Sequence, residues 1–98
     1  MPHVTVVATL VAQSGKETQV EALLRALVTP TRAEDGCIRY DLHRDLDNPG
    51  AFVFYETWAS RAALDAHSAS EHLARFAREG GPLLASRDVK VMELLEIL

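Results

Sequence analysis

The chain has 98 residues, which is enough for one small domain with a hydrophobic core but with little stability to spare. Hydrophobic residues make up 48% of it and charged residues 24%, a composition that is too apolar for a disordered protein and ordinary for a globular one. Fourteen acidic residues against ten basic residues give a formal net charge of -4, and the basic residues are scattered. This balance argues against nucleic acid or an anionic membrane as the partner.

Cysteine content and the first residues give an expectation for the compartment. The only cysteine, Cys37, cannot form a disulfide within the chain, which favours a reducing compartment. Residues 1–12 lack the basic segment of a signal peptide and are too short to span a bilayer. We therefore expect a cytoplasmic protein with a single domain that covers residues 1–98.

The N-terminal third predicts a strand followed by a helix. Residues 3–12 are rich in valine and threonine, whose branched side chains favour a strand. Ser14 and Glu17 have the spacing of a helix capping box, and apolar side chains then recur at helical intervals over residues 20–28. Pro30 disfavours helical geometry at the residue before it, so the helix is expected to end or kink there, with one further turn possible.

The middle of the chain predicts a β-hairpin. Residues 37–45 alternate between apolar and polar side chains, whereas residues 52–58 are mostly apolar on both faces, as is typical of an interior strand. Between them, residues 47–50 read Asp-Asn-Pro-Gly, which is a strong turn signal. The two strands are therefore expected to pair in antiparallel orientation.

The C-terminal half predicts helical structure and a last strand. Ser60 and Ser70 are each placed to cap a helix N-terminus, so a broken or two-part helix is expected before the Gly-Gly-Pro sequence at residues 80–82. Residues 88–98 form an apolar segment with strand periodicity.

The resulting element order, βαββαβ, predicts an α+β fold of the ferredoxin-like type, with an antiparallel sheet and the helices on one face. The helices can cover only one face of the sheet, although the third and fourth strands are apolar on both faces. A second copy of the chain is therefore expected to pack against the bare face and form a homodimer.

An acid and an imidazole are predicted to point into the layer between the sheet and the helices. Glu56 interrupts the apolar face of its strand, where a carboxyl group costs free energy unless it is paired, hydrated or protonated. His67 lies on the buried stripe of the following helix. His67 is the candidate general base because imidazole titrates near neutral pH, and Glu56 is the carboxylate expected to orient its ring. The alternative is a core pair that only ties the helix to the strand.

Further candidate substrate-binding residues are four aromatic side chains and a second histidine, namely Trp58, Tyr40, Phe54, Phe76 and His72. Aromatic residues on strands are more often plain core than ligand contacts. His72 follows His67 by five residues, an offset of about 140° on a continuous helix, so both can reach one site only if the helix breaks near Ser70. For that reason no metal site is predicted.

Four groups of residues occur together along nearly the whole chain: Asp35-Gly36-Cys37-Ile38-Arg39-Tyr40, the turn at 47–50, Glu56-Thr57-Trp58, and Ala63-Leu64-Asp65-Ala66-His67 followed by Ser70-Glu71-His72-Leu73. Together they resemble the antibiotic biosynthesis monooxygenase family. The likeness is greatest to its branch with the bacterial quinol monooxygenase and the isomerase that processes phosphorylated autoinducer-2. It implies the fold of the dimeric α+β barrel superfamily.

The resemblance also implies an activity. Oxygenases of the family use no metal, flavin or haem, so it implies an enzyme without a cofactor that acts on a small aromatic or quinone-like substrate and molecular oxygen. Ala8 stands where the haem-degrading relatives carry an asparagine, so haem cleavage is not expected. Two alternatives stay open. One is an isomerase of a small phosphorylated ketone, with Arg39 and Arg75 as the nearby basic residues. The other is a dimeric ligand-binding module without catalysis.

Overall fold

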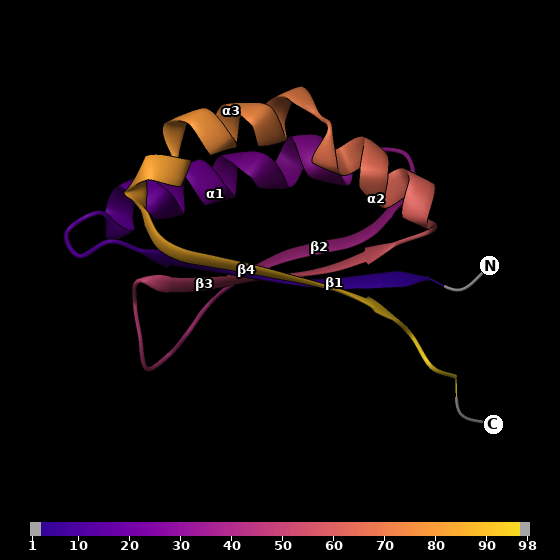
Figure 1. Ribbon diagram of the computed structural model, residues 1–98, viewed down its shortest axis with the longest axis horizontal. Coiled ribbons are helices and arrows are strands. Elements are labelled where there is room, and N and C mark those ends of the chain that lie inside the picture. The colour runs from indigo at the N-terminus through magenta and orange to yellow at the C-terminus, as the bar shows by residue number, and fades with distance from the viewer. Residues whose placement is uncertain (1–2, 97–98) are drawn as a thin grey trace.

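The computed structural model describes residues 3–96 and shows a four-stranded antiparallel sheet with helices along one face (Figure 1). In chain order the elements are β1 (Val4–Ala12), α1 (Glu17–Arg32), β2 (Cys37–Arg44), β3 (Ala51–Trp58), α2 (Arg61–Ser68), α3 (Glu71–Glu79), the 3-10 helix η1 (Gly81–Leu83) and β4 (Leu84–Glu93). The strand order is β2-β3-β1-β4, so the predicted ferredoxin-like α+β fold is confirmed. No helix within residues 3–96 is both long and apolar enough to cross a membrane.

The core lies between the sheet and the helices. In the central pair of strands, Val6 of β1 lies opposite Glu56 of β3, and Ala8 lies opposite Phe54. These four side chains are all buried and belong to the face that the helices cover. Glu56 is therefore a carboxyl group in the middle of an otherwise apolar layer, as the strand periodicity predicts.

The predicted hairpin is confirmed, because β2 and β3 pair in antiparallel register. Their connection is held by Asn48, whose side-chain oxygen accepts a hydrogen bond from the Gly50 backbone N–H at 3.1 Å. β3 is the predicted interior strand, since it lies between β1 and β2.

The start of α1 differs from the prediction. Its N-cap residue is Lys16, and no side chain caps the helix. The preceding residues form a turn instead, in which the Lys16 N–H donates to the Gln13 carbonyl at 2.9 Å and Gly15 has a φ of 85°. The predicted capping box from Ser14 is therefore wrong, because Ser14 belongs to this turn. At its other end, α1 runs through Pro30 to Arg32, within the further turn that the sequence allowed.

The predicted break in the helical segment is confirmed, and two serines define it. The Ser60 hydroxyl accepts a hydrogen bond from the Ala63 N–H at 3.1 Å and so begins α2. The Ser70 hydroxyl accepts one from the Leu73 N–H at 3.4 Å and begins α3. Because each helix has its own cap, side chains before and after the break are no longer related by the periodicity of one helix.

The last strand begins and ends earlier than predicted. Its pairing with β1 extends from Leu84 opposite Ala12 to Glu93 opposite Val4, so the length of β1 sets the length of β4. Residues 94–96 follow the strand, and residues 97–98 of the predicted segment lie outside the described residues.

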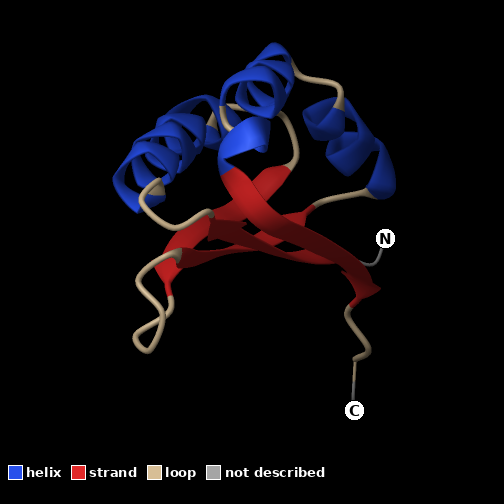
Figure 2. Cartoon of the chain, turned by 60° about the vertical axis from the view of Figure 1, so that its left-hand side comes forward, coloured by secondary structure: helices blue, strands red, loops and turns tan. Residues whose placement is uncertain are grey.

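The face of the sheet opposite the helices has no helix over it in the part of the chain that the structure describes (Figure 2). The register places Val7, Tyr55 and Met92 on this face, across the three strands β1, β3 and β4. Tyr55 and Met92 are 39% and 41% exposed. The face therefore offers apolar side chains to solvent near the middle of the sheet.

Candidate active site

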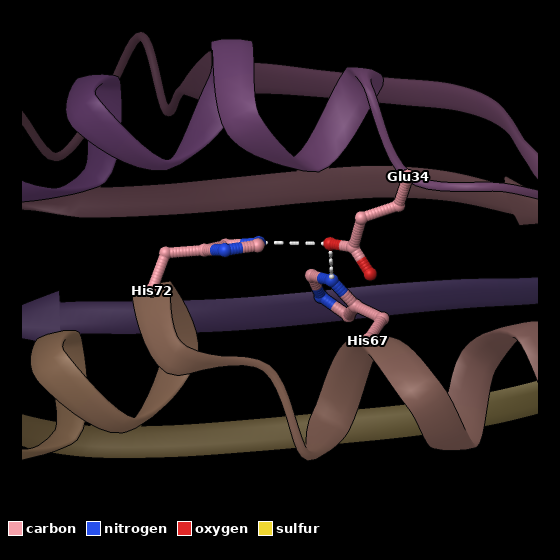
Figure 3. A group of neighbouring side chains, drawn as sticks. All are labelled: Glu34, His67 and His72. Atoms are coloured by element: carbon pink, nitrogen blue, oxygen red, sulfur yellow. Dashed lines mark hydrogen bonds and ion pairs between the residues drawn. The ribbon is translucent and has the colours of Figure 1, made fainter.

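Glu34, His67 and His72 meet in the layer between the helices (Figure 3). One oxygen of Glu34, Oε2, lies 2.8 Å from Nδ1 of His67 and 2.8 Å from Nε2 of His72. Only 5% of the His67 side chain is exposed, against 16% for Glu34 and 24% for His72. The three side chains form a hydrogen-bonded cluster that is buried at His67 and partly exposed to solvent at His72.

The loop between α1 and β2 brings Glu34 to the helices. Its conformation depends on Gly36, which has a φ of 83°. A Cβ atom at Gly36 would lie 2.6 Å from the side chain of Ala63 on α2, so the loop backbone packs directly on that helix. The Gly36 carbonyl also accepts a hydrogen bond from the Ala59 N–H at 2.8 Å. This close approach explains how a side chain 33 positions before His67 reaches its ring.

The hydrogen bonds to Glu34 assign the protons on the two rings. An ionised carboxylate can only accept, so Nδ1–H of His67 and Nε2–H of His72 are the donors. In neutral His67 the other ring nitrogen, Nε2, then carries a lone pair. Burial lowers the pKa of His67, while its hydrogen bond to Glu34 acts in the opposite direction. His67 is thus held mainly as a neutral, oriented imidazole.

His67 forms part of the wall of a cavity between the sheet and the helices. The interior of the cavity measures about 70 Å³, and about 480 Å³ are free of protein atoms when the open mouth is included. Aromatic and ionisable side chains in the wall include Tyr40, Phe54, Glu56, His67, Phe76 and Arg87. Most of the remaining wall is aliphatic. Such a narrow, largely apolar space with a few ionisable groups suits a small, flat, mostly apolar ligand.

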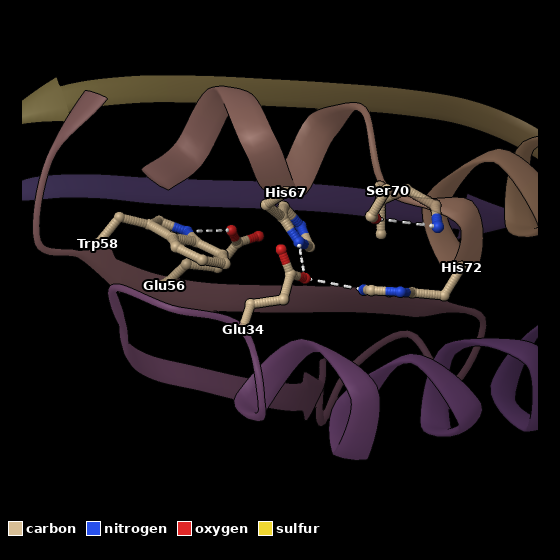
Figure 4. Close-up of polar contacts among 7 residues, drawn as sticks. Glu34, Glu56, Trp58, His67, Ser70 and His72 are labelled. Atoms are coloured by element: carbon tan, nitrogen blue, oxygen red, sulfur yellow. Dashed lines mark hydrogen bonds and ion pairs between the residues drawn. The ribbon is translucent and has the colours of Figure 1, made fainter. Parts of the chain in front are cut away.

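Glu56 has a different partner from the one predicted. Its Oε1 accepts a hydrogen bond from Nε1–H of Trp58 at 2.9 Å, whereas the carboxylate bonded to His67 is Glu34 (Figure 4). The predicted Glu56–His67 hydrogen bond is therefore wrong, both as a catalytic pair and as a structural tie. The physical reason is that Trp58 follows Glu56 by two positions on the same face of β3 and offers a donor within reach.

Burial has a large effect on Glu56, which is 4% exposed. Removal from water raises its pKa to about 7, against an ordinary value of 4.5. The Trp58 N–H offsets part of this rise, and the charge of Glu34 adds to it. A carboxyl group that titrates near neutral pH therefore lines the same cavity as His67.

The aromatic candidates occupy two kinds of position. Tyr40 and Phe54 stack with ring centroids 4.4 Å apart and line the cavity together with Phe76. Trp58 is wholly buried and lies outside the cavity wall, with its ring centroid 4.6 Å from that of His67. Trp58 thus supports the imidazole from behind. Burial also raises the pKa of Tyr40 far above its usual value, so its hydroxyl stays neutral.

Two residues of the site were missed by sequence analysis, Glu34 and Arg87. Glu34 precedes the Asp-Gly pair of a loop and carries no periodic signal, so only the fold reveals its position. Arg87 was missed because the last strand was predicted to begin one residue after it; in the structure it lies on β4 and lines the cavity. Arg39 and Arg75, the basic residues considered from the sequence, are instead paired with Asp41 and Glu79 and lie outside the cavity wall.

The chain is a ferredoxin-like domain with an oriented imidazole and a buried carboxyl group beside an aromatic cavity, and comparison with known proteins identifies its family. A sequence model described as "Antibiotic biosynthesis monooxygenase" matches residues 3–79. The chain therefore belongs to the antibiotic biosynthesis monooxygenase family, as the resemblance of its motifs indicated.

Individual relatives agree with this assignment. The chain is 42% identical over 91 residues to a Mycobacterium tuberculosis protein named "Putative monooxygenase Rv0793", covering 93% of this chain and 88% of that one. It is 37% identical over 73 residues to "Putative monooxygenase YcnE" of Bacillus subtilis, covering 74% of this chain and 77% of that one. Among solved structures, PA3566 from Pseudomonas aeruginosa matches with a TM-score of 0.93 and 38% identity, covering 98% of this chain and 97% of that one.

The buried carboxyl group leads to a prediction on stability and pH. Between about pH 4.5 and about pH 7, native Glu56 keeps a proton that the unfolded chain has released, so the free energy of unfolding should fall as the pH rises. The contribution is on the order of 3 kcal/mol across this window. Glu56→Gln should lack it, so the difference in stability between wild type and variant should change by that amount.

Urea unfolding at a series of pH values and one protein concentration measures this difference. Glu93→Gln, on the exposed end of β4, is the matched control and should follow the wild type at every pH. A constant difference between wild type and Glu56→Gln from pH 4.5 to 7 would show that Glu56 titrates as an ordinary carboxyl group.

Proposed function

We propose that the chain is a monooxygenase that oxidises a small phenol or hydroquinone with molecular oxygen, without a bound cofactor, and that His67 is its general base. The observation that carries the proposal is the orientation of His67, whose Nδ1–H is bonded to Glu34 while its ring lines an aromatic cavity. The names of the relatives support the monooxygenase class.

The proposed chemistry requires a base beside an aromatic hydroxyl group. Nε2 of His67 takes the hydroxyl proton, and Glu34 stabilises the imidazolium that forms. The electron-rich anion then transfers an electron to oxygen, and recombination of the radical pair forms a peroxide on the ring. Loss of water converts a hydroquinone and one oxygen molecule into a hydroxylated quinone and water, which balances atoms and electrons.

The walls of the cavity provide the other requirements. Tyr40 and Phe54 offer a stacked aromatic surface for a flat ring, and the largely apolar lining keeps bulk water from the peroxide. Glu56, with a pKa of about 7, is protonated in a large fraction of molecules at neutral pH. It can therefore return a proton to the departing oxygen, a role for which an ordinary carboxyl group is too acidic.

One further candidate function is favoured by a specific observation. An imidazole and a carboxyl group with a pKa near neutrality line one cavity, and this pair can also move protons in an isomerase of a small ketone. Arg87 in the same wall would contact a phosphate group on such a substrate. Turnover of a phosphorylated ketone without oxygen, together with no oxygen uptake on phenols, would favour this function. Ligand binding without turnover of either class would favour a binding module.

Activity measurements on two variants test the proposed base. His67→Ala should lower the rate of oxygen uptake on hydroquinones by about 10²–10⁴-fold, because the hydroxyl proton loses its acceptor. Glu34→Gln should lower the rate at least about tenfold, since an amide can donate to Nδ1 and leave the proton on Nε2.

An oxygen electrode with a panel of phenols and hydroquinones gives the rates, and circular dichroism verifies that each variant is folded. His43→Ala removes an exposed histidine on β2 and should keep the wild-type rate. Oxygen uptake by His67→Ala at the wild-type rate would exclude His67 as the base.

We also propose that the protein is a homodimer in which two copies bury their bare sheet faces against each other. Support comes from Val7, Tyr55 and Met92 on this face, which has no helix over it within residues 3–96. A face-to-face pair of four-stranded sheets would remove these apolar side chains from water.

Substitutions that introduce charge on the bare face test this assembly. Tyr55→Glu combined with Met92→Glu should convert the dimer into a monomer, because two carboxylates per copy would be buried at the interface without partners. Sedimentation velocity measures the mass. Ala22→Glu adds a charge to the exposed side of α1 and should leave the dimer intact. A wild-type monomer, or a double variant that stays dimeric, would contradict the proposal.

A further inference from the structure

The cluster of Glu34, His67 and His72 contains more than a single oriented base requires. Glu34 alone fixes the tautomer and the direction of the His67 ring, yet the same oxygen also binds His72. His72 comes from a second helix, α3, and is available only because the helical segment breaks at Ser70. The proposed oxidation assigns no task to His72, so the presence of a third member calls for an explanation of its own.

The donor atoms form a metal-binding set. Oε2 of Glu34, Nδ1 of His67 and Nε2 of His72 all lie within 4.8 Å of one another. Two imidazole nitrogens and one carboxylate oxygen are ligands that divalent zinc, iron, cobalt and nickel accept, with further coordination positions left open. We propose that these three side chains bind one divalent transition metal ion of the first row.

The donor atoms must rearrange around an ion. Ligand atoms about 2.0–2.2 Å from a common ion lie about 3.0–3.5 Å apart at tetrahedral or octahedral angles. Each ring nitrogen is already 2.8 Å from Oε2 of Glu34. The two ring nitrogens, which lie within 4.8 Å of each other, must also come to this separation, and His72 and Glu34 retain enough exposure for their side chains to rotate.

The surroundings also suit a cation. Within residues 3–96, no lysine or arginine is paired with Glu34, so its charge is shared only between the two imidazoles. The buried carboxyl group of Glu56 adds negative charge nearby when it is ionised, and the charge of Glu34 in turn raises the pKa of Glu56. A groove between α1 and α3 reaches His72 from outside, and its charged lining residues are Arg75 and Glu79, which pair with each other. An ion can thus enter on the His72 side without crossing the cavity.

Metal binding would change which ring nitrogens of the two histidines carry protons. The ion requires the lone pairs of Nδ1 of His67 and Nε2 of His72, which carry protons in the hydrogen-bonded state. Each neutral ring must therefore move its proton to its other nitrogen. Metal-loaded His67 then presents Nε2–H to the cavity and has no lone pair for a substrate proton. Metal occupancy and base catalysis by His67 exclude each other, so the ion would act as an inhibitor of the proposed oxidation.

Cobalt titration tests the site without reference to activity. Purified protein, dialysed against a chelator and then against metal-free buffer, is titrated with Co²⁺ while its visible d–d absorption is recorded. We expect saturation at one ion per chain and displacement by Zn²⁺, which binds such sites more tightly. Glu34→Gln and His72→Ala should each weaken binding at least tenfold, whereas His43→Ala should bind as the wild type does.

The outcomes separate this inference from the proposed function. Absence of a saturable d–d band, or equal Co²⁺ affinity in wild type and His72→Ala, would overturn the metal site, even if oxygen uptake depends on His67. Saturable binding that depends on Glu34 and His72 would support the site, even if no phenol is oxidised. Circular dichroism of each variant ensures that lost binding is not lost folding.

Discussion

One carboxylate oxygen, Oε2 of Glu34, organises the functional layer of this protein. It accepts hydrogen bonds from His67 on α2 and His72 on α3, and so it fixes the donor nitrogen of each ring. A buried imidazole without such a partner would be free to adopt either tautomer. The interaction depends in turn on Gly36, which lets the loop backbone lie against α2. The loop, the helix break and the orientation of His67 are therefore parts of one structural arrangement.

Burial is the second constraint, and it acts on His67 and Glu56 in opposite directions. Removal from water disfavours the charged form of each group, so it lowers the pKa of the imidazole and raises that of the carboxyl group. Glu56 therefore has a pKa of about 7, whereas the pKa of His67 lies below its ordinary value. A cavity that contains both groups can exchange protons with a substrate at low cost in either direction. The apolar layer that stabilises the fold thus also shifts the pKa values of the two groups that the proposed reaction uses.

Much of the fold could be predicted from the sequence, because strand and helix periodicity, the turn at residues 47–50 and the caps at Ser60 and Ser70 are local signals. Failures occurred where the decisive contact was distant or competed with a neighbour. The capping box at Ser14 was displaced by a turn, and the length of β4 follows from β1. Periodicity correctly placed Glu56 and His67 in one layer. It could not reveal that Trp58 would donate a hydrogen bond to Glu56, or that the partner of His67 would be Glu34 from a loop.

The central claim is that neutral His67 carries its proton on Nδ1 and leaves Nε2 free. Nitrogen-15 NMR of histidine-labelled, metal-free protein measures this directly, because protonated and bare ring nitrogens have well-separated chemical shifts. The signals that disappear in the His67→Gln variant are assigned to His67. The account predicts a protonated Nδ1 and a bare Nε2 for His67 at a pH where the ring is neutral. A neutral His67 with its proton on Nε2 would contradict it.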